Sequence, residues 1–259
     1  MELSIIIPVF DESKKIARDV EVASAFLVSN GLKGEIIIVD DGSRDGTAEV
    51  AEAAKVPAEV QRRVIRYEQH RGKGFAVRTG IKISQGVNVM FVDSGNCIPY
   101  HYALTALKML QDGDGDIAHG SRKLTQSRIH VPQPWHRRVF SKLFRWLMIA
   151  VMGVPARFTD TQCGFKIYRG EMARELYGAC ITDGFMFDIE IMLRALRRGF
   201  RIKEFPIEWT ADPDSRTTRT LSLRQMLREL LTIKRRVSFP EDCHSEPRRL
   251  LSGEESGGE

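Results

Sequence analysis

The chain has 259 residues, of which 42% are hydrophobic and 28% charged, and its formal net charge is +5. This composition is ordinary for a soluble globular protein, and the length suits one large α/β domain with appendages. The longest apolar run, residues 146–156, has eleven residues, which excludes a membrane-spanning helix because such a helix needs about 20.

Strands and helices alternate over the first 121 residues. Unbroken apolar runs predict strands at 3–8, 35–40, 60–67, 88–93 and 116–120. Apolar residues at helical spacing predict helices at 13–30, 47–54, 74–84 and 102–110. Apolar strands without alternation are typical of parallel sheets covered on both faces. The pattern therefore predicts a doubly wound, mostly parallel α/β sheet.

The pattern changes after residue 121. Further strands are predicted at 163–168 and 202–209, and a helix at 187–198. Segments 135–152 and 221–233 are predicted to form basic amphipathic helices, and residues 117–159 contain eight Lys/Arg and no acid. Such helices can lie in the headgroup layer of a membrane without crossing it. Alternatively, they pack on the sheet and expose a solvated basic face.

We expect one domain over residues 1–237, with a nucleotide-binding half at 1–121 and an acceptor half at 122–237. Residues 238–259 are rich in Pro, Ser, Gly and Glu and are predicted to be a disordered tail without chemistry. This tail holds six acids and two Lys/Arg, so the remainder carries 37 basic and 28 acidic groups, a net charge of +9. Such an excess favours anionic partners.

The four cysteines form no CxxC pair and no metal-like cluster. This favours a reduced, cytoplasmic setting over a disulfide framework. The N-terminus leads straight into a predicted strand, so no signal peptide is expected.

Two predicted strands end in carboxylates, Asp40 and Asp41 after the second strand and Asp93 after the fourth. The carboxyl ends of parallel strands share one edge, where open α/β sheets bind ligands. Acids and glycines in segment 40–47 can accept hydrogen bonds from ribose or a base, or they can form only a capped turn. The GxGxxG dinucleotide fingerprint is absent after either early strand.

Two further segments lie at predicted strand-to-helix turns. After the first strand, Phe10 can stack on a base and Glu12 can hydrogen-bond a base or ribose, although Asp11 or Ser13 can also simply cap the next helix. Lys73 precedes a predicted helix, whose N-terminal amides together with an ammonium suit an anion. Its Gly-Lys-Gly setting is not a Walker loop and can also be an ordinary turn.

Asp93 is the candidate ligand for Mg²⁺ or Mn²⁺. A hard ion that bridges phosphates needs more than one oxygen ligand, and Ser94, Asn96 and Asp188 are the available additions. Asp188 begins a predicted helix, where the helix dipole favours an acid in any case. Arg122 and Arg216 can clamp phosphate oxygens through paired hydrogen bonds, or they can be merely solvated.

Six motifs in order resemble family-2 glycosyltransferases of the GT-A fold. They are residues 7–12 (IPVFDE), 39–47 (VDDGSRDGT), 71–78 (RGKGFAVR), 120–122 (GSR), 160–166 (DTQCGFK) and 187–190 (FDIE). The resemblance covers roughly residues 3–236, and two of the motifs, 71–74 and 160–166, look most like dolichyl-phosphate β-glucosyltransferases.

The resemblance implies a role for each candidate residue. The residues expected to bind the nucleotide are Pro8, Phe10, Glu12, Asp40, Asp41 and Lys73. Asp93 stands at the first acid of the family's Asp-x-Asp, which binds Mg²⁺ or Mn²⁺ on the diphosphate, and the second acid falls on Gly95. Arg122 and Arg216 are expected to face phosphates, and Asp188 to lie near the transferring sugar.

The implied activity is inverting transfer of glucose from UDP-glucose to a polyprenyl or dolichyl phosphate by an enzyme peripheral to the cytoplasmic membrane face. A phosphate acceptor needs little general-base help, whereas a hydroxyl acceptor would need a base such as Asp188. The alternatives are another donor, a soluble saccharide acceptor, or a non-catalytic nucleotide-sugar-binding relative. Nucleic-acid binding is not expected, because no motif for it appears.

Overall fold

The computed structural model describes residues 1–130, 135–211 and 223–237. The predicted phosphate ligand Arg216 and the predicted tail at 238–259 lie outside these residues. No helix in the described part of the chain is long and apolar enough to span a membrane.

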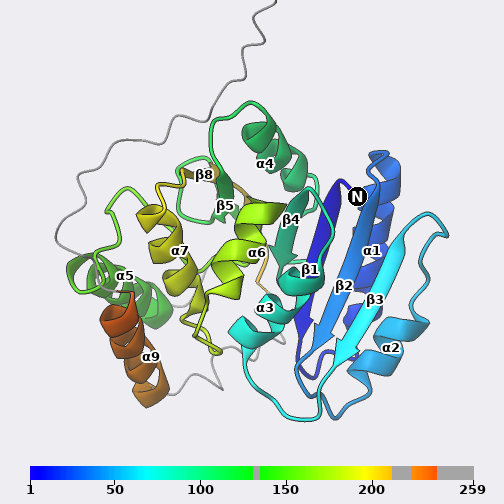
Figure 1. The fold of residues 1–259 in the computed structure, drawn as a ribbon, viewed down its shortest axis with the longest axis horizontal. Coiled ribbons are helices and arrows are strands. Elements are labelled where there is room, and N and C mark those ends of the chain that lie inside the picture. Colours follow the sequence, from blue (N-terminus) through cyan, green and yellow to red (C-terminus); the bar gives the residue numbers. More distant parts are fainter. Residues whose placement is uncertain (131–134, 212–222, 238–259) are drawn as a thin grey trace, which may run out of the picture.

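A seven-stranded sheet with the order β3-β2-β1-β4-β7-β5-β8 forms the centre of the molecule (Figure 1). Its strands are β1 (Leu3–Val9), β2 (Gly34–Asp40), β3 (Gln61–Arg66), β4 (Asn88–Val92), β5 (Ile117–Ser121), β7 (Phe165–Arg169) and β8 (Ile202–Pro206). All pairings are parallel except those that β7 makes with β4 and β5. The predicted mostly parallel α/β sheet is therefore confirmed.

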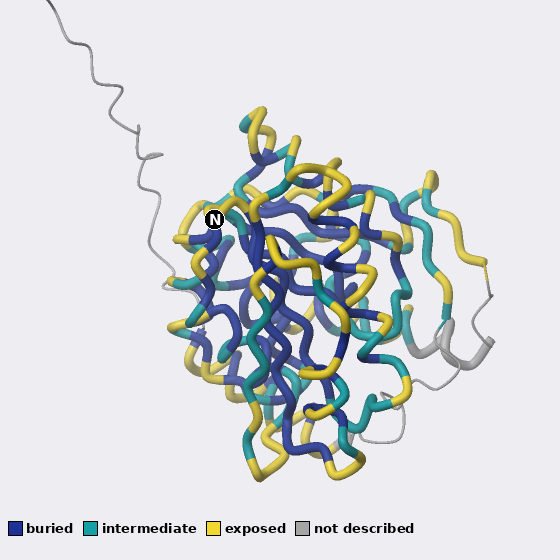
Figure 2. Tube along the Cα trace, turned by 90° about the vertical axis from the view of Figure 1, so that its right-hand side faces the viewer, coloured by how far each residue is buried: buried dark blue, intermediate teal, exposed yellow. Residues whose placement is uncertain are grey.

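Helices cover both faces of the sheet. They are α1 (Ile16–Ser29), α2 (Thr47–Ala53), α3 (Lys73–Ile83), α4 (Tyr102–Gln111), α5 (Trp135–Ala150), α6 (Gly170–Gly178), α7 (Phe187–Arg197) and α9 (Leu223–Arg236). Side chains alternate between the faces along each strand, so Ile6 packs with α3, α6 and α7, whereas Ile5 and Ile7 pack with α1 and α4. The buried strands form one continuous layer inside an exposed shell (Figure 2).

Two details differ from the prediction. Helix α6 was not expected, and the single strand expected at 202–209 is divided into β8 and a short β9 (Glu208–Trp209). Strand β9 pairs with β6 (Arg128–Ile129) in a separate small sheet. The division occurs because the chain leaves the main sheet after Pro206 to join this second pairing.

The antiparallel strand β7 explains why distant segments meet at one edge. Its first residue, Phe165, lies opposite Val92, the last residue of β4. The Asp93 N–H donates to the Gly164 carbonyl at 3.0 Å, which joins the chain before β7 to the chain after β4. Segment 160–164 therefore reaches the same sheet edge as Asp93 and the end of β5.

Candidate active site

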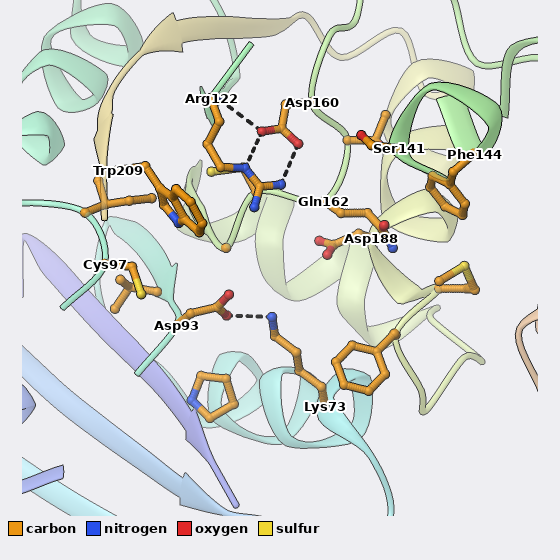
Figure 3. Close-up of a pocket in the computed structure, with 18 of the residues that line it drawn as sticks. Lys73, Asp93, Cys97, Arg122, Ser141, Phe144, Asp160, Gln162, Asp188 and Trp209 are labelled. Atoms are coloured by element: carbon orange, nitrogen blue, oxygen red, sulfur yellow. Dashed lines mark hydrogen bonds and ion pairs between the residues drawn. The ribbon is translucent and has the colours of Figure 1, made fainter. Parts of the chain in front are cut away.

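A cleft of about 460 Å³ opens at the carboxyl edge of the sheet, and both halves of the chain line it (Figure 3). Sequence-predicted residues that line it are Pro8, Phe10, Glu12, Asp41, Lys73, Asp93, Arg122 and Asp188. The fold thus brings eight predicted site residues to one cavity, although they come from six separate segments of the chain.

One end of the cleft carries two aromatic rings and a buried acid. The rings of Phe10 and His70 have centroids 4.1 Å apart. Asp41 accepts hydrogen bonds from the backbone N–H groups of Arg71 at 2.7 Å and Gly72 at 2.8 Å, and its Oδ2 lies 2.9 Å from His70 Nδ1. Burial raises the pKa of Asp41 even though these hydrogen bonds oppose the shift. With two aromatic rings and a carboxylate, this end of the cleft is suited to bind a flat ring that has polar groups at its edges.

Asp40 lies beneath this end of the cleft rather than on its wall. Its side chain is fully buried, and its Oδ1 accepts from the Ser43 N–H at 2.9 Å. The described structure gives Asp40 a part in holding the 40–43 turn and does not bring it into the cavity. Its predicted contact with a nucleotide stays a prediction.

The middle of the cleft contains an ion pair between Lys73 and Asp93 (Figure 3). Lys73 Nζ lies 2.5 Å from Asp93 Oδ1. Burial opposes the charge of the ammonium, but the carboxylates of Asp93 and Asp188 outweigh burial and raise the pKa of Lys73. A cation is therefore fixed next to the predicted metal ligand.

The loop after Asp93 is held from behind by Asp19, a buried residue of α1. Asp19 accepts from the Gly95 N–H and from Asn96 Nδ2, both at 2.8 Å. Asn96 has a φ of +49° and its Nδ2 donates to Asp19. This bond uses the amide nitrogen and not the Oδ1 that a metal would need, so the role of Asn96 as a ligand in place of the acid missing at Gly95 stays a prediction. Ser94 does line the cleft.

Asp93 retains the properties of a metal ligand. Its Oδ1 is buried, and the Lys73 ammonium 2.5 Å away is its partner among the described residues. Mg²⁺ is commonly held by one or two carboxylates together with substrate phosphates, so a single carboxylate at this point fits a diphosphate-bound ion. No group of three or more His, Cys, Asp or Glu side chains suited to a metal occurs in the described part of the chain.

Asp188 forms a buried ion pair with Lys166, a residue that sequence reasoning missed as a partner. Lys166 Nζ contacts Asp188 Oδ1 and also donates to the Thr161 carbonyl at 2.9 Å. Burial raises the pKa of Asp188, and the ammonium groups of Lys166 and Lys73 oppose that shift. The first turn of α7 therefore presents an oriented carboxylate to the cleft.

Arg122 is fixed in the cleft wall by Asp160. Its Nε lies 2.6 Å from Asp160 Oδ2 and its Nη2 lies 2.8 Å from Oδ1, which is a paired, fork-shaped contact. Burial disfavours the Asp160 carboxylate, but Arg122 outweighs burial and lowers the pKa of Asp160. Asp160 belongs to the 160–166 motif, but the sequence of that motif did not predict that Asp160 pairs with Arg122.

Apolar side chains line the cleft beyond these charges. They come from α5, α9 and the connections between elements: Phe144, Met148, Ile149, Val154, Phe158, Phe185, Met186 and Met226. We call this part of the cleft the apolar arm. One cavity thus offers a ring-binding end, a charged middle and a long apolar end.

An α/β sheet with acids and cations at its carboxyl edge is typical of enzymes that bind nucleotide-linked substrates. The family model described as glycosyl transferase family 2 matches residues 4–176, and the chain belongs to that family.

Curated relatives cover most of the chain. A dolichyl-phosphate beta-glucosyltransferase of Drosophila melanogaster is 30% identical over 246 residues, which are 90% of this chain and 74% of that protein. The enzyme of the same name from Saccharomyces cerevisiae is 29% identical, with the same shares of the two chains.

Among solved structures, glucosyl-3-phosphoglycerate synthase from Mycobacterium tuberculosis in complex with Mn²⁺, uridine diphosphate and phosphoglyceric acid has a similar fold. It superposes with a TM-score of 0.69 at 20% identity, covering 93% of this chain and 80% of that one. At this level of sequence identity, the comparison shows that the two proteins share a fold.

Proposed function

We propose that this protein is an inverting glycosyltransferase that moves glucose from UDP-glucose to a polyprenyl phosphate at a membrane surface. The observation that carries this proposal is the single cleft in which a ring-binding end, a charged middle and an apolar arm follow one another. A nucleoside, a diphosphate-linked sugar and a lipid phosphate need these three environments in that order. The names of the curated relatives agree with this donor and acceptor class.

Residues 1–121 form the nucleotide-binding half in this proposal. The uracil lies against Phe10 and His70, and the polar groups of Asp41 and Glu12 face the base or ribose. Lys73 lies at the start of α3 and neutralises a diphosphate oxygen, as expected of an ammonium at a helix N-terminus. The ring contact between Phe10 and His70 supplies the stacking surface.

The reaction needs positioned charges more than a base. A phosphate oxygen of the acceptor is anionic at neutral pH, attacks the anomeric carbon and forms the new C–O bond. The C–O bond to UDP breaks at the same carbon, and UDP leaves with the electron pair, so configuration inverts. Two anions must approach each other, and the Lys73 and Arg122 cations reduce their repulsion.

Asp93 would hold a divalent ion, Mg²⁺ or Mn²⁺, together with the diphosphate. When bound, that ion supplies further positive charge to the leaving group. Asp188 lies near the sugar in this proposal, where the buried Lys166 fixes its carboxylate for hydrogen bonds with sugar hydroxyls.

The acceptor half, residues 122–237, meets the membrane through α5 and α9. These helices lie next to each other at one end of the molecule (Figure 1). They expose Leu143 (60%), Trp146 (62%), Leu227 (45%) and Leu231 (54%) to solvent. Exposed basic side chains accompany them: Lys142, Arg224, Arg228, Lys234, Arg235 and Arg236.

We call these exposed apolar and basic residues of α5 and α9 the docking surface. Apolar side chains beside Lys and Arg suit the boundary between acyl chains and anionic headgroups. The same helices supply Phe144, Met148 and Met226 to the apolar arm, so a lipid chain can pass from the membrane into the cleft. The cytoplasmic membrane face is the proposed location.

Transfer of labelled glucose from UDP-glucose into a lipid-extractable product tests the function. Polyprenyl phosphate in vesicles is the acceptor, with Mn²⁺ or Mg²⁺ and again with EDTA, and soluble saccharides are the control acceptors. The expected result is a lipid-linked glucosyl phosphate that is cleaved by mild acid and whose formation depends on UDP-glucose. Transfer only to the saccharides, or UDP binding without any turnover, would contradict the proposal.

A further inference from the structure

A single carboxylate joins the docking surface to the loop that leads into the cleft. Helix α9 contains five basic residues and one acid, Glu229. Glu229 Oε2 accepts a hydrogen bond from the Met186 N–H at 3.1 Å, and Met186 is the residue that immediately precedes α7. The only acid of the basic helix therefore points toward the protein and not toward the proposed lipid.

The protein leaves room for this carboxylate. A Cβ on Gly184 would lie 2.0 Å from Glu229 Oε1, so any larger residue at 184 would displace it. Gln225, one turn earlier on α9, donates to Glu229 Oε1 at 3.1 Å and orients it further. Partial burial raises the pKa of Glu229, while its hydrogen bond with the Met186 amide opposes the shift.

The loop that Glu229 holds, residues 181–186, also supports the Lys73 end of α3. The Asp183 carbonyl accepts from the Phe75 N–H at 3.1 Å, and the Asp183 carboxylate pairs with Arg78 at 2.5 Å. Close approach is enforced at Gly74, where a Cβ would lie 2.6 Å from the Thr182 carbonyl oxygen. A shift of the loop must therefore move the start of α3 as well.

The same loop continues directly into the cleft wall. Phe185 and Met186 line the apolar arm, and Asp188 follows in the first turn of α7. Met226 also lines the arm from α9, three residues before Glu229. Helix α9 thus carries part of the docking surface on one side, and its other side contacts the segment that leads to Asp188 and, through α3, to Lys73.

We propose that Glu229 is a positioning residue that transmits the seating of α9 on an anionic lipid surface to the 181–186 loop, and through it to Asp188 and Lys73. The inference rests on the proposed membrane function of the docking surface. Contact with lipid restrains the motion of α9. The restrained helix keeps the hydrogen bond between Glu229 and Met186 formed, and the 181–186 loop is therefore more ordered. Membrane binding and an ordered active site thereby favour each other.

Hydrogen exchange of the full chain, with and without vesicles of phosphatidylcholine and phosphatidylglycerol, tests this without requiring turnover. In the wild-type protein, vesicles should slow amide exchange in residues 181–187 by about tenfold, which corresponds to about 1.4 kcal/mol. Glu229→Ala should still bind vesicles, as measured by flotation, but lose this slowing. Glu229→Gln keeps an acceptor oxygen and should retain most of it.

Thr232→Ala is the matched control, because Thr232 is exposed on α9 and its hydroxyl donates to the Arg228 carbonyl of the same helix. This variant should behave like the wild type. Kinetics supply a second readout: vesicles should raise kcat in the wild-type protein, and Glu229→Ala should lose that rise without a change in vesicle affinity.

The outcomes separate the two proposals. If the wild-type protein does not float with vesicles, the docking surface is wrong and this inference is wrong with it. If it floats but residues 181–187 exchange at the same rate, or if Glu229→Ala shows the same slowing as the wild type, only the transmission is wrong. Slowing that depends on Glu229 supports the transmission even if another donor or acceptor is the true substrate.

Discussion

Gly164 leaves the space that the Asp93 carboxylate occupies. A Cβ on residue 164 would lie 2.0 Å from Asp93 Oδ2 and 2.1 Å from Cγ, closer than any stable contact. The predicted metal ligand Asp93 can therefore occupy its position only because residue 164 of the 160–166 motif has no side chain. The requirement arises because β7 and β4 are neighbours in the sheet.

The first prediction follows from this contact. Gly164→Ala should displace Asp93 and lower kcat/KM for UDP-glucose by about 100-fold or more, because small displacements of a reacting geometry cost that much. Overpacking should also cost about 1–3 kcal/mol of stability. Steady-state glucosyl transfer and urea unfolding measure the two effects.

Gly178→Ala is the matched control, since a Cβ on Gly178 meets nothing within 4 Å. It should leave transfer unchanged and stability unchanged or slightly higher. An active Gly164→Ala enzyme would show that the Asp93 position is not critical.

The second prediction concerns the ion pair of Lys73 and Asp93. Lys73→Met removes a positive charge 2.5 Å from the carboxylate, so Mn²⁺ alone should bind about tenfold more tightly. The same change should raise the KM for UDP-glucose, because the diphosphate loses a cation. Electron paramagnetic resonance of free Mn²⁺ measures the first effect without activity.

Lys123→Met is the control for a lysine that lines the cleft but bonds to Ser141 instead of Asp93. Its Mn²⁺ affinity should equal that of the wild-type protein. Unchanged Mn²⁺ affinity in Lys73→Met would mean that the metal does not use Asp93.

The third prediction is a pH dependence of stability from Asp160. Asp160 is buried and its pKa is lowered from the ordinary value of 3.8, with Arg122 overcoming the effect of burial. As pH falls below 3.8, the unfolded chain takes up this proton before the folded protein does, so the stability due to Asp160 decreases. Above 3.8 that contribution is fully present.

Asp160→Asn breaks a buried pair and should cost about 3–5 kcal/mol at neutral pH. The difference in unfolding free energy between this variant and the wild-type protein should shrink as pH falls below 3.8. Urea unfolding at several pH values measures it, and a difference that is constant down to acid pH would contradict the assignment. Exposed Asp112, paired with Lys108 in one helix turn, is the control position.

Local sequence patterns predicted the sheet and the residues at its edge. An apolar run that ends in an acid spans fewer than about ten residues, so it can be recognised without knowledge of tertiary contacts. Asp41 and Asp93 were placed in this way, Lys73 was placed from a Gly-Lys-Gly turn before a helix, and all three share one cleft. The pairings were not predictable, since Arg122 and Asp160 are 38 residues apart and Lys166 and Asp188 are 22 apart. No local pattern reports which distant side chains meet.

The direction of β7 was likewise hidden from sequence patterns. Its apolar run is the same whether the strand is parallel or antiparallel, yet its direction brings Gly164 beside Asp93. The loop at Gly95 shows the same limit, because the hydrogen bond that orients the Asn96 amide comes from Asp19, 77 residues away, and no local pattern indicates it. Sequence identifies chemical groups, and tertiary contacts decide which remain free to act.

The last prediction concerns the docking surface. Trp146 is 62% exposed on α5, and burying an aromatic side chain of this kind at a membrane interface contributes about 1.5–3 kcal/mol. Trp146→Ser should therefore weaken binding to vesicles of phosphatidylcholine and phosphatidylglycerol by about tenfold or more. Val87→Ser changes a residue that is 69% exposed just before β4, at the edge of the sheet opposite the cleft, and should not alter binding. Flotation at several lipid concentrations measures both, and equal losses in the two variants would show that α5 does not face the lipid.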